Sequence, residues 1–146
     1  MDKKDSSIEL IKSLPKENMI EIMSKKIYMV HYPMNRDMKF KKHVKIADLK
    51  ENEKMFEDVD ADIYLYGHTH SEIYNKNIKK YYINPGALGC PRKTDEAHYG
   101  VLEINKKTIT YKQLTVKYNV KKVIDDINKL AFPGYKNVLK VFYGVD

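Results

Sequence analysis

Two short apolar runs, each followed closely by histidine, constrain this chain more than any other feature of its sequence. The run Ile63–Tyr66 precedes Gly67-His68-Thr69-His70, and the run Ile27–Val30 precedes His31. Runs of this kind are typical of strands that are buried on both faces of a sheet. In an extended segment, residues two apart point to the same side, so the two histidines of the first motif are expected to project together from a strand end. The sequence therefore predicts three imidazoles at the ends of two buried strands.

Three imidazoles in this arrangement favour metal chemistry. Neutral histidine is the commonest metal ligand and suits zinc, manganese, iron and nickel. Three histidines and a water molecule complete a catalytic zinc site, whereas a dinuclear site also needs carboxylates. A lone histidine beside a core strand is more often structural or exposed, and we interpret His43 and His98 in that way. The predicted metal ligands are His31, His68 and His70.

Length and composition limit the class of protein. A chain of 146 residues is long enough for one domain, and its 42% hydrophobic and 32% charged residues are ordinary for a soluble protein. No apolar segment approaches the roughly 20 residues of a membrane span, and the N-terminus lacks the apolar core of a secretory signal. The single cysteine, Cys90, excludes an intrachain disulfide and a thiolate zinc cluster. These features predict a cytoplasmic protein without a membrane span.

The charge pattern argues against a nucleic-acid-binding protein. The formal net charge is +7 and the pI is about 9.2, which could suggest such a partner. Only Arg36 and Arg92 are arginines, although arginine is the preferred reader of bases and phosphates, and the lysines are scattered along the chain. The joint excess of Lys, Asn, Ile and Tyr is typical of codon bias in an AT-rich genome, and a mild attraction to anionic substrates stays open.

The order of predicted elements is mixed α/β first and antiparallel β later. Capping-box spacing of Ser6 and Glu9 predicts a helix that ends before Pro15. Apolar periodicity and turn residues give the other elements. We expect strands at 18–23, 26–31, 61–66, 72–74, 78–83, 99–104 and 108–116, and helices at 46–59, after Asn119 and at 135–142.

The motif Gly67-His68-Thr69-His70 resembles the closing motif of the calcineurin-like metallophosphoesterases. The resemblance extends over nearly the whole chain. Within that family, the chain is similar to the small bacterial and archaeal phosphodiesterase branch. It also includes Leu10–Lys16, the strand ending in His31, Ile83–Gly86 followed by Gly89, Pro91 and Arg92, and Tyr99 with the closing hairpin and helices.

The resemblance implies both a fold and a reaction. The fold is a two-sheet α/β/β/α sandwich, with a mixed sheet, antiparallel hairpins and flanking helices. The reaction is hydrolysis of a phosphomonoester or phosphodiester at a dinuclear site that holds divalent metal ions, with Mn, Ni, Zn, Fe and Mg all candidates. By resemblance, His31 and His68 bind the second metal and His70 binds the first, while Gly67, Asn84 and Gly86 support the loop.

The sequence departs from the family in its first half. Family members begin with Asp-x-His, Gly-Asp and Gly-Asn-His/Cys-Asp motifs, which supply the bridging aspartate and other ligands. None of these motifs is present, so we expect residues 1–146 to be a single incomplete domain that lacks the N-terminal metal-binding half. No residue is assigned as the catalytic acid or base. Tyr32 replaces the usual glycine after the first histidine, and Ala87 replaces a frequent serine.

Three hypotheses of function follow. The first is the C-terminal portion of a metal-dependent phosphoesterase, weak or inactive as this chain alone. The second is a non-catalytic remnant that acts as a binding or regulatory module, and the third is a mononuclear three-histidine metal site. The missing strands are expected to leave a sheet edge exposed, so the candidate partners besides a phosphoester are an N-terminal half on a separate chain and a second copy of this chain.

Overall fold

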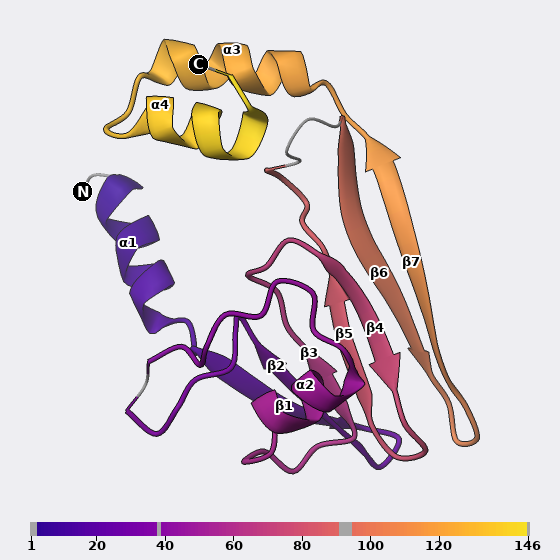
Figure 1. Cartoon of the computed structure of the whole chain (residues 1–146). Coiled ribbons are helices and arrows are strands. Elements are labelled where there is room, and N and C mark those ends of the chain that lie inside the picture. Colours follow the sequence, from indigo (N-terminus) through magenta and orange to yellow (C-terminus); the bar gives the residue numbers. More distant parts are fainter. Residues whose placement is uncertain (1–2, 38, 91–94, 146) are drawn as a thin grey trace.

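The structure, a computed structural model, describes residues 3–37, 39–90 and 95–145, and its central element is a five-stranded mixed sheet (Figure 1). The strand order is β1-β2-β3-β5-β4, with β2, β3 and β5 parallel and the two edge strands antiparallel. Parallel neighbours place their carboxyl ends at one edge of the sheet. The segments that follow β2 and β3 therefore begin side by side. The strands are β1 (Glu17–Ile22), β2 (Lys25–Val30), β3 (Ile63–Leu65), β4 (Glu72–Lys76) and β5 (Tyr81–Pro85).

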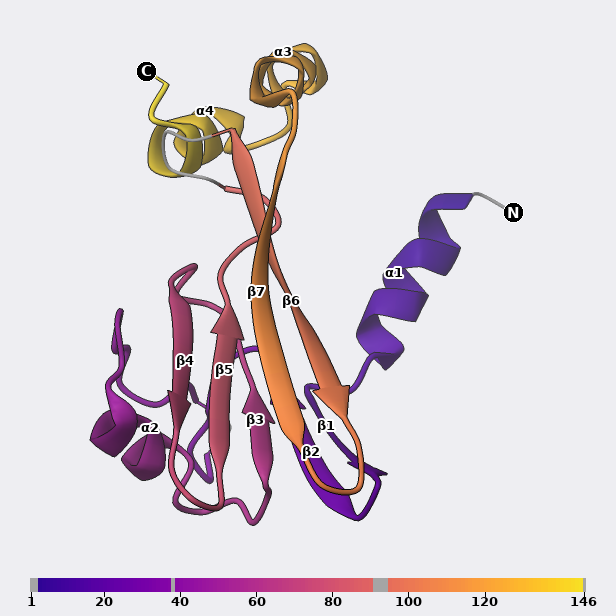
Figure 2. The ribbon, with the colours of Figure 1, turned by 90° about the vertical axis from the view of Figure 1, so that its right-hand side faces the viewer.

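A two-stranded ribbon of β6 (Glu96–Ile104) and β7 (Ile109–Lys117) packs on one face of this sheet (Figure 2). Ile27, Ile63 and Ile83 are buried on that face, against apolar side chains that include Leu102 and Tyr111 of the ribbon. Since side chains alternate along a strand, the residues between them face the other way. That opposite face is aromatic and carries Tyr28, Tyr64, Tyr66 and Tyr82.

One helix covers the aromatic face of the sheet, and the C-terminal helices lie beyond the ribbon. Helix α2 (Leu49–Met55) lies over the aromatic face and buries Met55 and the adjoining Phe56. It begins at Asp48, whose side chain accepts a hydrogen bond from the Glu51 amide in a capping box. Figure 1 shows the C-terminal helices beyond the far end of the ribbon. The remaining helices are α1 (Lys3–Ser13), α3 (Val120–Leu130), α4 (Tyr135–Val138) and the π-helical turn η1 (Leu139–Tyr143).

The predicted fold class is confirmed: the chain is mixed α/β, with a mixed sheet, antiparallel hairpins and flanking helices. The helix predicted at 46–59 is shorter because the Asp48 cap fixes its start, and Ile46 before it is 71% exposed. The first helix already contains Ser6, so the predicted cap lies inside it. Pro91 and Arg92, which belong to the family resemblance, lie outside the described residues.

Many large apolar side chains are exposed at the β1 edge of the sheet. Helix α1 extends away from this edge and lies over neither face of the sheet (Figures 1 and 2). Every residue of β1 is exposed, as are the large apolar side chains of α1. They are Ile8, Leu10, Ile11 and Leu14 in and beside α1, and Met19, Ile20, Ile22 and Met23 in and beside β1.

No helix in the described ranges is both long enough and apolar enough to span a membrane.

Candidate metal centre

A cavity of about 460 Å³ lies where the chain leaves β2 and β3, and histidines line it. His31 follows β2 directly, while His68 and His70 lie in the loop after β3. The structure thus brings all three predicted ligands to one cavity. Its complete lining is His31, His43, Lys45, His68, Thr69, His70, Val141 and Phe142.

The histidine loop after β3 has a different geometry from the one predicted. We expected an extended segment in which alternation alone directs His68 and His70 to the same side. Instead β3 ends at Leu65, and both histidines adopt left-handed backbone conformations, with φ of 70° and 55°. Such values are uncommon for residues other than glycine and occur where the surrounding structure holds the chain in place.

Asn84, at the end of β5, holds this loop in place through hydrogen bonds. Its side chain is fully buried, and its Nδ2 donates to the Gly67 carbonyl and to Thr69 Oγ1, each at 3.0 Å. Its Oδ1 accepts a hydrogen bond from the Gly86 amide at 3.0 Å. Gly86 has φ +88°, and a Cβ there would lie 3.0 Å from His98 Cβ, so glycine is required at this turn. Asn84 therefore ties the histidine loop to the following turn.

His31 and His68 form a close pair of imidazoles. His31 Nε2 lies 3.1 Å from His68 Nδ1, and the ring centroids are 5.1 Å apart. Burial lowers the pKa of His68 below its ordinary value, and the neighbouring histidines lower it further. Both causes favour the neutral imidazole, which is the form that binds a metal.

His43 and Lys45 belong to this cavity, although the sequence analysis did not select them. The His43 ring centroid lies 5.4 Å from that of His68. Tyr32 holds this part of the chain, since its fully buried Oη accepts from the Val44 amide at 2.9 Å and donates to the Lys42 carbonyl at 3.2 Å. His43 lies in a segment without strand or helix periodicity, and only its position between two buried elements could have drawn attention to it. By contrast, His98 lies outside this cavity, with its Nδ1 against the Glu72 carboxylate.

The donor set fits a metal ion only in part. Two nitrogens that each lie about 2.0–2.1 Å from one ion are about 3 to 3.4 Å apart, which matches the His31–His68 pair. Among the described residues, however, no three His, Cys, Asp or Glu side chains are placed to hold one ion together. A third ligand has to come from a rotation of His43 or His70, or from outside the described ranges. No described residue that lines the cavity is a carboxylate, so these residues do not fit a dinuclear centre by themselves.

Solved structures of similar fold support this architecture. A hypothetical protein from Pyrococcus horikoshii is 17% identical with a TM-score of 0.75, and the match covers 94% of this chain and 53% of that one. A metallophosphoesterase from Sphaerobacter thermophilus is 20% identical with a TM-score of 0.67, covering 98% and 62%. Wild-type Vps29 complexed with zinc, from Entamoeba histolytica, is 21% identical with a TM-score of 0.51, covering 73% and 63%. The chain thus spans less than two thirds of each of these proteins.

The sequence itself identifies the family. No curated protein sequence matches the chain. The model of the calcineurin-like phosphoesterase superfamily domain, however, matches residues 1–107, which include β1 to β6 and the whole histidine loop. The predicted resemblance is confirmed, and this chain belongs to the calcineurin-like phosphoesterase superfamily.

Proposed function

We propose that this chain contributes the histidine side of a metal-dependent phosphoesterase site, with His31, His68 and His70 as metal ligands. The observation that carries the proposal is the cavity that these three residues line at the strand ends, with the His31 and His68 nitrogens 3.1 Å apart. The family match supports hydrolysis of a phosphoester as the reaction. A cytoplasmic location stays a prediction.

The residues of the cavity have different proposed roles in binding the metal and the phosphate. Neutral imidazoles bind a divalent ion, and such an ion supplies Lewis-acid polarisation of the phosphate and a water molecule of lowered pKa. The Lys45 ammonium lines the same cavity and is suited to hold a phosphate oxygen and offset its charge. Asn84 keeps the histidine loop in place and acts as a positioning residue.

Because no described lining residue is a carboxylate, we expect the phosphoesterase activity of this chain alone to be low. Three neutral imidazoles leave the charge of two divalent ions uncompensated, so a dinuclear centre needs carboxylates from elsewhere. We therefore expect the chain alone to bind at most one ion tightly and to hydrolyse phosphodiesters weakly. The described lining holds imidazoles and no carboxylate, which also favours a second candidate, a mononuclear three-histidine site.

Metal analysis and an activity assay test this proposal together. Purified chain is loaded separately with Mn, Ni, Zn, Fe and Mg, bound metal is measured by elemental analysis, and hydrolysis of bis-p-nitrophenyl phosphate is followed. His68→Ala should remove the bound ion, whereas His98→Gln, at a histidine outside the cavity, should retain it. Metal content that is unaffected by His68→Ala would contradict the site. Turnover comparable to that of a longer relative, abolished by His68→Ala, would contradict the expected weakness of this chain alone.

The apolar surface of α1 and β1 supports a proposal about partners. Eight large apolar side chains of this surface are between 37% and 67% exposed. Exposed apolar surface beside a free strand edge is typical of a surface that another polypeptide covers. We propose that the partner is either a separate chain that carries the carboxylate motifs or a second copy of this chain.

A further inference from the structure

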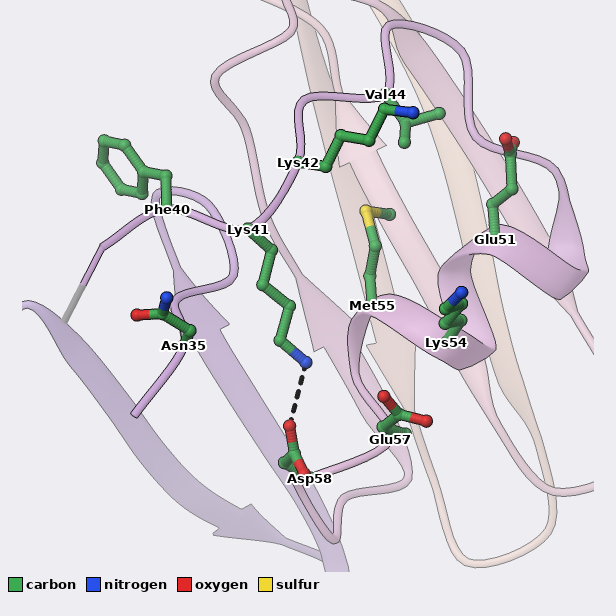
Figure 3. Close-up of a pocket in the computed structure, with 10 residues that line it drawn as sticks. All are labelled: Asn35, Phe40, Lys41, Lys42, Val44, Glu51, Lys54, Met55, Glu57 and Asp58. Atoms are coloured by element: carbon green, nitrogen blue, oxygen red, sulfur yellow. Dashed lines mark hydrogen bonds and ion pairs between the residues drawn. The ribbon is translucent and has the colours of Figure 1, made fainter. Parts of the chain in front are cut away.

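A second, larger cavity lies next to the histidine cavity, and the two share one wall. It measures about 630 Å³, within the usual range for small-molecule sites (Figure 3). The shared wall is the segment 40–45, which runs between the two cavities. Lys42 and Val44 line the larger cavity, whereas His43 and Lys45 line the histidine cavity.

The inner surface of the larger cavity is apolar. Met55 is 6% exposed and forms part of its floor, together with Val44 from the shared wall. Phe40 lines the same cavity, and its ring is close to the histidines, with centroids 5.4 Å from His68 and 6.1 Å from His31. Phe40 is nevertheless 54% exposed, so an aromatic surface is open to solvent beside the imidazole pair. A flat apolar group could stack there while remaining attached to a phosphate in the histidine cavity.

The chain around this cavity is held by a set of short-range bonds. The Asn35 amide donates to the Lys39 carbonyl, and the Lys41 amide donates to the Pro33 carbonyl, each at 2.8 Å. The Lys41 ammonium also forms an ion pair with Asp58 at 2.9 Å, which links the loop to the end of α2 (Figure 3). The cavity is therefore preformed rather than dependent on a ligand to order it.

The charged side chains that line the cavity balance one another. Three lysines stand against three carboxylates, namely Lys41, Lys42 and Lys54 against Glu51, Glu57 and Asp58. The described lining therefore carries no net charge, and its apolar floor favours an uncharged group on the ligand.

We propose that this second cavity binds the organic part of the phosphoester, an uncharged flat aromatic group that stacks on Phe40 beside the histidines. This inference deepens the proposed function by assigning a substrate class to a site beside the histidines. It rests on the proposed function for the phosphate's position, but binding to the cavity itself requires no metal.

Ligand binding without metal tests the proposal separately from catalysis. Adenosine 5′-monophosphate is the probe, with adenosine and inorganic phosphate as its two halves, and each is titrated into the chain in EDTA while backbone amide shifts are followed by NMR. We expect the nucleotide to shift the amides of Val44 and Met55 and to bind more tightly than either half. Phe40→Ala should weaken nucleotide binding at least about fivefold, and Phe40→Trp should retain it.

Charge variants provide the matched control. Lys45→Gln, in the histidine cavity, should weaken binding of the nucleotide but not of adenosine, whereas Lys50→Gln, outside both cavities, should change neither. Equal nucleotide affinity in Phe40→Ala and the parent chain, or phosphate binding as tight as that of the nucleotide, would overturn the proposal. Loss of metal binding or of activity alone would instead contradict only the proposed function, because this titration contains no metal.

Discussion

At the scale of single residues, Asn84 is the side chain on which the histidine loop most depends. Asn84→Ala leaves the Gly86 amide without its partner and the Gly67 carbonyl with only the Thr69 amide, and an unsatisfied buried group costs about 1–3 kcal/mol. We expect a lower free energy of unfolding and, because the ligands lose their support, zinc affinity reduced by about 10- to 100-fold. Urea denaturation and a competitive zinc titration measure the two effects.

Asn75 offers a control of the same residue type. Its Nδ2 donates to the Ala47 carbonyl at 2.8 Å, outside the histidine loop. Asn75→Ala should therefore reduce stability while zinc affinity stays unchanged. If both variants lower zinc affinity equally, the effect of Asn84 is general destabilisation rather than support of the ligands.

Tyr82 makes the stability of the core sensitive to alkaline pH. Burial, followed by the neighbouring Tyr64 and Glu53, raises the pKa of Tyr82 to about 12. An unfolded tyrosine titrates near pH 10, so the unfolded state loses its proton first as the pH rises. The contribution of Tyr82 is thus complete below about pH 10 and decreases as the pH rises through about 12. Thermal denaturation at a series of pH values should show this loss, and Tyr82→Phe should make the curve flatter; an unchanged curve would contradict this origin.

At the scale of elements, Tyr32 connects β2 to the segment that carries His43. Its Oη is bonded to both the Val44 amide and the Lys42 carbonyl, so Tyr32→Phe leaves these groups unpaired next to the cavity. We expect a loss of about 1–3 kcal/mol in the free energy of unfolding and faster hydrogen exchange at the Val44 amide. Tyr64→Phe is the control, because its hydroxyl bonds Val59 and Ala61 instead. Unchanged exchange at Val44 in Tyr32→Phe would contradict this role.

The elements also show how far the sequence could predict the fold. The runs at β2 and β3 were recognised because burial on both faces selects continuous apolar residues. The sequence could not predict where the first helix starts, since capping-box spacing placed its cap at Ser6 and the helix already contains that residue.

The sequence indicated some residues of the candidate site but not the backbone conformation that places them. His31, His68 and His70 were selected because they follow strands, and they line one cavity, but the backbone of the last two is left-handed rather than extended. His43 was missed because the pairing of Tyr32 with Val44 that places it joins residues without periodic spacing. Such tertiary contacts leave no local pattern in a single sequence.

At the scale of the whole molecule, the exposed apolar surface of α1 and β1 predicts association. If a second copy covers this surface, light scattering at rising protein concentration should give a mass above the 17.2 kDa of one chain. Ile11→Lys should then return the chain to a monomer because it places a charge in the apolar contact, whereas Glu9→Lys on the same helix should not. A mass of one chain at every concentration would exclude the homodimer and leave the separate carboxylate-bearing chain as the proposed partner.

The left-handed backbone of His68 has a consequence for how this protein could evolve. Glycine is normally worse than alanine for stability, but at a positive φ the order is reversed because alanine pays a steric cost that glycine avoids. His68→Gly should therefore melt at a higher temperature than His68→Ala, whereas alanine should be the better substitute at His43, which does not have a positive φ. A lineage that no longer needed the imidazole could therefore improve its thermostability by a change to glycine at this position.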